Sequence, residues 1–186
     1  MIRAFIAVDL PEDVRSAVTE AQARLKRAHT GVKVSWTKIE NLHLTLQFLG
    51  YVEEEVIAKI GVELEAVASR YAPFDVNVAG AGNFPRVLWV GCNSDTLKTL
   101  AQAVQAAMEP LGFRPERREF SAHLTLGRIK SPRMDVALTR ALDSIKNQDF
   151  GTLRVESIHL FQSELHPDGS IYSKLSSHQL GERHAS

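Results

Sequence analysis

Apolar residues along the chain follow two different spacings. A repeat every three or four positions, typical of amphipathic helices, covers residues 11–27, 53–71, 95–111 and 135–147. Shorter apolar or alternating runs, typical of strands, cover residues 2–10, 34–37, 42–49, 74–79, 86–92, 123–129, 153–162 and 170–180.

The order of these elements predicts an α+β fold. Helices and strands alternate, but the last two strands form a hairpin across the turn-forming sequence His-Pro-Asp-Gly at 166–169. This hairpin and the short β–β connections are typical of antiparallel sheets rather than of a doubly wound parallel fold. We therefore expect two antiparallel-rich sheets with flanking helices around a central cleft.

Length and composition indicate one globular domain. The chain has 186 residues, of which 44% are hydrophobic and 24% charged, as in ordinary globular proteins. We expect residues 1–186 to form a single two-lobed domain, with disorder confined to the tail after about residue 180. The single cysteine, Cys92, excludes an internal disulfide and any cysteine-based metal cluster.

The charge balance limits how a nucleic acid is bound. Lys plus Arg and Asp plus Glu number 22 each, so no global basic field attracts a polyanion. A nucleic-acid ligand must be recognised locally, at an end or at a single phosphate. The first apolar run is short and broken by Arg3 and Asp9, and no stretch is long enough for a membrane helix. We expect a cytoplasmic monomer without a membrane or protein partner.

One tetrapeptide, His-Leu-Thr-Leu, occurs twice, at 43–46 and at 123–126. Chance is a poor explanation for such a repeat, and a strand duplicated only for packing is the alternative. On a strand, alternate residues share a face, so His43 lies beside Thr45, and His123 beside Thr125. The leucines on the opposite face can pack under helices, whereas the polar pairs need water or a ligand. Two such strands, in two similar halves, would line one polar cleft.

These residue types suit acid–base chemistry on a phosphate. One histidine can take a proton from an attacking water while the other gives a proton to the departing oxygen. Threonine hydroxyls can hold the non-bridging oxygens, and Arg128 would add a planar positive charge. Arg128 lies at an odd offset from His123, so it reaches the cleft only if the strand bends or bulges near Gly127. A strained cyclic phosphate suits such a site, because its hydrolysis needs acid–base catalysis more than a hydroxide generated by a metal ion.

At these residues the chain resembles the two-histidine (2H) phosphoesterases, whose signature is a pair of His-x-Thr/Ser-x motifs. More narrowly it resembles the RNA 2′,3′-cyclic phosphodiesterases, also named 2′-5′ RNA ligases. The similarity extends to four further stretches: 3–11, 41–50, 84–91 and 158–165. It departs at Ala122, where proline is frequent, and at Gln47, where a basic residue is common.

The resemblance implies a pseudo-twofold, two-lobed fold and a specific reaction. RNA ending in a 2′,3′-cyclic phosphate would be hydrolysed to a 2′-phosphate without a metal or other cofactor, and reversible 2′-5′ joining of RNA ends would be a further activity. It implies that His43 is the general acid and His123 the general base. Thr45 and Thr125 would hold the phosphate.

The other candidate residues have weaker support. Phe48 could stack on a base, but strict alternation places it on the leucine face, where core packing is favoured. Arg86, in a turn, is either an RNA contact or a solvated surface residue. His159 and His178, in the closing hairpin, are interpreted as structural or exposed rather than as cleft residues. No acidic residue lies at metal-ligand spacing from either motif histidine, so no metal site is expected.

Two alternative functions stay open on the sequence. One is a binding module that holds RNA or nucleotide phosphate ends without chemistry. The other is a phosphodiesterase of the same architecture that acts on a small cyclic nucleotide or an ADP-ribose cyclic phosphate. The motifs do not separate these from an enzyme acting on RNA ends.

Overall fold

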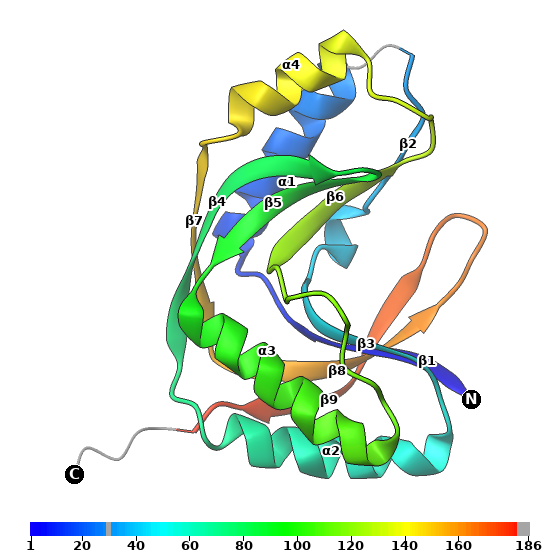
Figure 1. Cartoon of the computed structure of the whole chain (residues 1–186), viewed down its shortest axis with the longest axis vertical. Helices are drawn as coiled ribbons and strands as arrows, with labels where there is room; N and C mark the ends of the chain where they lie inside the picture. Colours follow the sequence, from blue (N-terminus) through cyan, green and yellow to red (C-terminus); the bar gives the residue numbers. More distant parts are fainter. Residues whose placement is uncertain (29–30, 182–186) are drawn as a thin grey trace.

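The chain folds into two antiparallel sheets that lie end to end, each covered by helices (Figure 1). The structure, a computed structural model, describes residues 1–28 and 31–181. The expected α+β class with two antiparallel sheets is confirmed. The tail expected to be disordered lies mostly outside the described residues.

We call the two sheets A and B. Sheet A has the strand order β3-β1-β8-β9, with bounds Leu44–Val52, Ile2–Val8, Ser157–Glu164 and Ile171–Gln179. Sheet B has the order β2-β6-β5-β4-β7, with bounds Val34–Trp36, His123–Ile129, Val87–Asn93, Phe74–Phe84 and Asp149–Val155. Each sheet therefore contains one of the two His-Leu-Thr-Leu segments.

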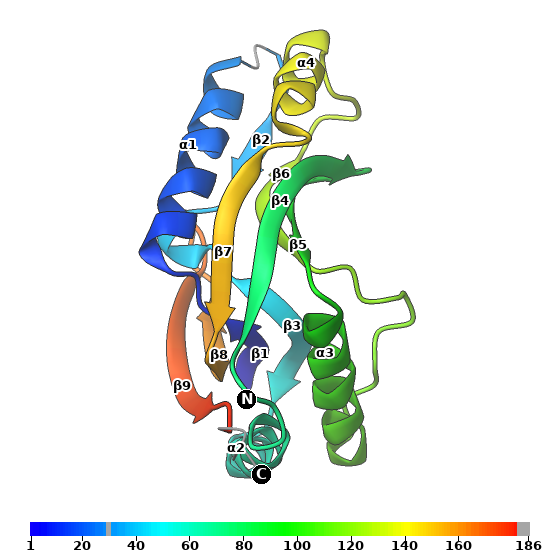
Figure 2. The ribbon, with the colours of Figure 1, turned by 90° about the vertical axis from the view of Figure 1, so that its left-hand side faces the viewer.

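The helices cross between the sheets before they pack. Helix α1 (Glu12–Ala28) follows a strand of sheet A but packs with α4 (Val136–Ile145) on sheet B. Helix α3 (Asp95–Met108) follows a strand of sheet B but packs with α2 (Glu54–Ala68) on sheet A (Figure 2). Because one helix from each half packs on the sheet of the other half, the two sheets share one continuous core.

The helix boundaries follow the sequence signals closely. Ser94 caps α3 by accepting a hydrogen bond from the Leu97 N–H at 3.2 Å, and Asp135 caps α4 through the Leu138 N–H at 2.7 Å. Two short 3₁₀ turns complete the helical elements, η1 (Ile39–Asn41) before β3 and η2 (Glu109–Leu111) after α3.

The predicted strand 153–162 is wrong. It is two strands, β7 in sheet B and β8 in sheet A, separated by Glu156 alone. No glycine or proline lies between 152 and 163, so composition did not mark the corner. At this corner the Leu180 N–H donates to the Glu156 carbonyl at 2.8 Å, which anchors the backbone between the two sheets.

Buried residues elsewhere agree with the apolar pattern. Cys92 is buried, and this burial raises the pKa of its thiol to about 12, which keeps it protonated. His159 and His178 are buried polar residues with side-chain hydrogen-bond partners, so they are structural rather than exposed. Among the described residues, no helix is long and apolar enough to cross a membrane.

Candidate active site

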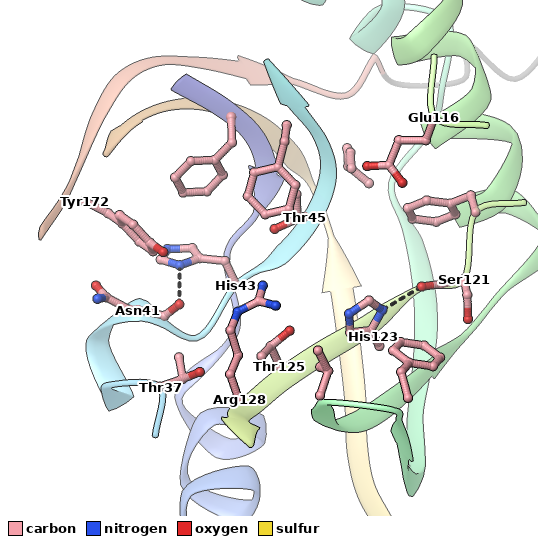
Figure 3. Close-up of a pocket in the computed structure, with 16 residues that line it drawn as sticks. Thr37, Asn41, His43, Thr45, Glu116, Ser121, His123, Thr125, Arg128 and Tyr172 are labelled. Atoms are coloured by element: carbon pink, nitrogen blue, oxygen red, sulfur yellow. Dashed lines mark hydrogen bonds between the residues drawn. The ribbon is translucent and has the colours of Figure 1, made fainter. Parts of the chain in front are cut away.

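The two His-Leu-Thr-Leu strands meet at one cavity. β3 forms an edge of sheet A and β6 lies second from the edge of sheet B, and their polar faces line a cavity of about 350 Å³ between the sheets. Figure 3 shows the residues that line it. The repeated residues in this lining are His43, Thr45, His123 and Thr125. The structure thus brings together the four residues that the repeat indicated.

Both strands carry a β-bulge at the same position of the motif. In the pairing of β1 with β3, Ile6 lies opposite Gln47 and Ala7 opposite Thr45, so Leu46 is the extra residue. In the pairing of β5 with β6, Leu88 lies opposite Gly127 and Trp89 opposite Thr125, so Leu126 is the extra residue. A bulge re-aims the side chains that follow it. The repeat therefore includes a backbone irregularity as well as four residue types.

The bulges decide where two further candidates point. Phe48 and Arg128 occupy equivalent places after the two bulges, and both line the cavity. The expectation that Phe48 packs in the core is wrong, because its side chain is 57% exposed. Gln47, its neighbour, is the buried residue instead. Arg128 was expected in the cleft only if the strand bends or bulges near Gly127. The bulge at Leu126 meets this condition, and Figure 3 shows the Arg128 guanidinium in the cavity.

Gly127 allows the edge strand to approach the second bulge. A Cβ built on Gly127 would lie 2.8 Å from Val34 Cγ1 and 3.1 Å from the Ser35 carbonyl oxygen. Any side chain there would push β2 away from β6. The glycine is thus required for packing beside the bulge, which keeps the backbone around Arg128 in place.

Each motif histidine is oriented by the same hydrogen bond. Nδ1 of His43 donates to the Asn41 carbonyl at 3.0 Å, and Nδ1 of His123 donates to the Ser121 carbonyl at 2.7 Å. A carbonyl can only accept, so Nδ1 carries the hydrogen in both rings. Nε2 is therefore the atom of each ring that can gain or lose a proton in the reaction.

A carboxylate beside His43 was missed by the sequence analysis. Asp9, in the loop between β1 and α1, places Oδ1 at 3.3 Å from His43 Nε2. Its Oδ2 lies 2.5 Å from Lys174 Nζ and 3.6 Å from His159 Nε2. The cluster joins Asp9 just after β1 and His43 just before β3 with residues of β8 and β9, which sequence spacing alone cannot place together.

The charges in this cluster shift two pKa values. The hydrogen bond from His43, together with Lys174 and His159, holds the pKa of Asp9 well below its usual range. Burial, with the charge of Lys174 as a second cause, lowers the pKa of His159 to about 4. At neutral pH the cluster therefore contains a charged carboxylate and a neutral His159. His159 keeps its place through Ser157 Oγ at 3.0 Å and Ser177 Oγ at 2.9 Å.

The environment of His123 is different. Its ring meets Phe84 edge-on, with centroids 5.1 Å apart, and no ion pair among the described residues involves it. The cavity lining includes one acidic residue, Glu116, from the segment before β6. Figure 3 shows Glu116 on the His123 side, away from Arg128. Among the described residues, only the first of the two motif histidines forms an ion pair with a carboxylate in the active site.

Arg86 does not join the cavity. It is exposed in the turn between β4 and β5, and its carbonyl accepts from the Ile129 N–H at 2.8 Å. Its neighbours Phe84 and Val87 line the cavity, but Arg86 does not. Tyr172 and Asn41 line it without having been singled out from the sequence. Alternation in the closing hairpin could have marked Tyr172, whereas Asn41 had no signal beyond its place before the motif.

No arrangement of three or more His, Cys, Asp or Glu residues suited to a metal ion occurs within residues 1–28 and 31–181.

Comparison with known proteins agrees with this site. The family described as LigT-like phosphoesterases matches the chain twice, over residues 8–89 and 90–172. Each match contains one His-Leu-Thr-Leu segment, in agreement with two similar halves. An RNA 2′,3′-cyclic phosphodiesterase from Methanothermobacter thermautotrophicus is 38% identical over 180 residues, covering 94% of this chain and 96% of that protein. One from Archaeoglobus fulgidus is 38% identical over 181 residues, covering 94% and 98%.

Solved structures show the same fold. A crystal structure of a Thermus thermophilus protein superposes with a TM-score of 0.83 at 31% identity, covering 98% of this chain and 100% of that one. A crystal structure of Escherichia coli LigT complexed with 3′-AMP superposes with a TM-score of 0.76 at 24% identity, covering 96% and 98%. The repeated motif, the cleft between two sheets and these similarities lead to one conclusion: the chain belongs to the LigT-like phosphoesterase family.

Proposed function

We propose that the protein hydrolyses RNA 2′,3′-cyclic phosphate ends to 2′-phosphomonoesters. The observation that carries the proposal is the pair of histidines, each fixed through Nδ1, on two strands that line one cavity with two threonines and an arginine. The relatives named RNA 2′,3′-cyclic phosphodiesterases support the substrate, because they match this chain over nearly its full length.

In the proposed reaction the two histidines act on opposite sides of the phosphorus. Nε2 of His123 takes a proton from water as the water oxygen bonds to phosphorus. The bond between phosphorus and the 3′ oxygen breaks, and Nε2 of His43 gives its proton to that oxygen. The products are a 2′-phosphate and a free 3′-hydroxyl, and each histidine ends in the other's starting protonation state. Proton exchange with solvent restores the pair.

Asp9 provides a physical reason for the direction of this transfer. The Asp9 carboxylate lies 3.3 Å from His43 Nε2, where it can accept a hydrogen bond from the proton that an acid gives away. No ion pair between described residues involves His123, so Nε2 of that ring has no such acceptor among them. The assignment of acid and base, which rested on resemblance alone in the sequence, thus gains support from the geometry.

The remaining cavity residues would hold the phosphate and the terminal base. Hydroxyls of Thr45 and Thr125 donate to the non-bridging oxygens, and Arg128 balances the charge that they gain in the transition state. Phe48, exposed at the cavity mouth, offers a ring on which the terminal base can stack. If a 5′-hydroxyl replaces water as nucleophile, the same proton transfers join two RNA ends by a 2′-5′ bond.

The decisive experiment identifies the product. The purified protein is incubated, with a chelator, with an oligoribonucleotide that ends in a 2′,3′-cyclic phosphate, and the position of the product phosphate is determined. We expect multiple turnovers and a 2′-phosphate. Replacement of either His43 or His123 by alanine should lower kcat/KM by about 10² to 10⁴, with the fold checked by circular dichroism.

Three results would contradict the proposal. Binding without turnover would favour a module that holds phosphate ends. A 3′-phosphate product would reverse the identity of the leaving oxygen. Full activity of either alanine variant would remove the two-histidine mechanism.

A further inference from the structure

A second groove opens from the active cavity along the edge of sheet B. It has a volume of about 420 Å³ and lies between η1, β2 and the turn that joins β8 to β9. The groove and the active cavity share Thr37, Asn41, Arg128 and Tyr172 in their linings. The groove and the cavity are therefore neighbours, and Arg128 borders both.

Two contacts hold the wall of this groove in place. Asn41 Nδ2 donates to the Ser170 carbonyl at 2.7 Å, which ties the segment before β3 to the β8–β9 hairpin. The side chain of Lys38 lies along Gly169, where a built Cβ would be 3.2 Å from Lys38 Cε. Gly169 has φ +114, a conformation that other residues rarely adopt. Gly169 thus allows the conformation of the turn and leaves room for the Lys38 side chain.

The charges give the connected spaces a direction. Lys38 is exposed in the groove and Arg128 stands where the groove joins the cavity, and none of the ion pairs between described residues uses either cation. Glu116 lines the cavity at the opposite end (Figure 3). The groove lining also contains one carboxylate, Asp168, against the two cations Lys38 and Arg128, so its balance is positive. A polyanion in the cavity is attracted toward the Lys38 end and repelled from the Glu116 end.

A third depression beside the cavity also contains cations. Its lining includes Phe5, Phe48 and Leu165 together with Arg3 and the shared Arg128. The Arg3 guanidinium already donates to Ser163 Oγ at 3.0 Å. The Lys38 groove differs because its cation takes part in no ion pair between described residues and lies with the aromatic residues Trp36 and Tyr172 in one lining.

We propose that the Lys38 groove binds the nucleotide immediately 5′ of the cyclic end of a single-stranded RNA. The inference rests on the proposed function, and it adds where the second-last nucleotide of the RNA is bound. Lys38 contacts the phosphodiester that links the last two nucleotides, and the aromatic residues contact the penultimate base. Cations plus aromatic rings are the usual means of holding single strands without sequence readout.

The test compares two substrates that differ by one nucleotide. The quantity measured is the ratio of kcat/KM for a dinucleotide ending in a 2′,3′-cyclic phosphate to kcat/KM for the mononucleoside 2′,3′-cyclic phosphate with the same base. The wild-type ratio should be at least about five, as one stacked base provides. In Lys38→Ala the ratio should fall about five-fold at low salt, because one phosphate contact is lost.

Three further variants sharpen this measurement. Lys38→Arg should keep most of the ratio, and Asp168→Asn should raise it by removing the carboxylate in the groove lining. Lys59→Ala, an exposed lysine on α2, is the matched control and should leave the ratio unchanged. The slope of log kcat/KM for the dinucleotide against log salt should become about 0.7 less steep in Lys38→Ala alone.

The outcomes separate this inference from the proposed function. A wild-type ratio near one, or a ratio that Lys38→Ala does not change, overturns the proposal that the Lys38 groove binds the second-last nucleotide. If neither substrate is turned over, the proposed function fails instead. The groove is then tested by the dissociation constants of the corresponding mononucleoside 2′-phosphate and dinucleotide 2′-phosphate, for which the same ratios are expected.

Discussion

The two His-Leu-Thr-Leu strands have the same backbone frame but different surroundings. Both histidines donate through Nδ1 to the carbonyl two residues earlier, and both strands bulge at the second leucine. After the bulge one strand presents Phe48 and the other presents Arg128. Asp9 lies beside the first histidine, and the second has no ion-pair partner within the described residues.

This difference indicates how a duplicated element can perform two roles. The repeated part fixes which nitrogen of each histidine donates to the backbone and where the fifth residue after the histidine points. The unrepeated residues then decide the charge that each strand brings to the phosphate. Residues outside the tetrapeptide would therefore decide which histidine is the general acid and which is the general base. They would also decide which strand stacks on the RNA base and which strand stabilises charge.

Among the variants that test the difference between the two strands, the largest expected effect comes from the two residues after the bulges. Arg128→Ala should lower kcat by about 10² to 10³, because a donor to the charged oxygens is lost mainly in the transition state. Phe48→Ala should raise KM about ten-fold with little change in kcat, because stacking of the base is equal in ground and transition states. Steady-state kinetics on a dinucleotide cyclic phosphate measure both.

Arg128→Lys and Phe48→Leu are the matched controls. Lysine keeps the charge but not the planar fork, so only part of kcat should return. Leucine keeps apolar area without a ring face, so KM should stay raised. Equal effects of the two alanine variants on kcat would show that the equivalent positions do not have different roles.

The sequence predicted the fold and the repeated site residues because their signals are local. Spacing placed the helices, and the doubled tetrapeptide identified His43 and His123. Alternation failed at Phe48 because a bulge, which inserts one residue against the partner strand, has no dependable signature in residue type. The odd offset of Arg128 indicated the second bulge only after a role for that arginine had been assumed.

Residues that act through tertiary contacts could not be predicted. Asp9 follows a buried strand, like many surface acids, and its contacts come from β3, β8 and β9. His159 is apolar-flanked in sequence, and its partners Ser157 and Ser177 meet only when the hairpin forms. The same holds for the corner at Glu156, where the strand pattern runs from one sheet into the other.

Removal of the Asp9 charge tests the asymmetry between the histidines directly. Asp9→Asn should lower kcat about five-fold, a modest effect because the Asp9 side chain is 38% exposed. The reaction needs His43 protonated and His123 neutral, so the pH–rate profile is bell-shaped. Without the carboxylate, Nε2 of His43 loses its partner at 3.3 Å, so kcat should fall while KM stays.

Asp143→Asn, an exposed acid on α4, is the control for this comparison. It should leave kcat unchanged. A merely structural role of Asp9 would lower the thermal midpoint without lowering kcat. An unchanged kcat in Asp9→Asn would show that the carboxylate beside His43 does not assist the proton transfer.

The smallest expected effect concerns the free energy of unfolding and His159, which belongs to the cluster around Asp9 and His43. Burial lowers the pKa of His159 to about 4 from its ordinary value of 6.5. Between these values the unfolded chain binds a proton that the folded chain does not, so the free energy of unfolding falls as pH falls. His159 should therefore cost about 1–2 kcal/mol of stability between pH 7 and pH 5.

His159→Gln should remove this part of the pH dependence, because glutamine keeps hydrogen-bonding groups but does not titrate. Urea unfolding at pH 7 and at pH 5 measures the difference, with His166→Gln in the exposed turn as the control. The lowered pKa of Asp9 acts in the same direction, but only as pH falls below about 4. If the free energy of unfolding of His159→Gln still falls as much between pH 7 and pH 5 as in the wild type, the acid-sensitive group is not His159.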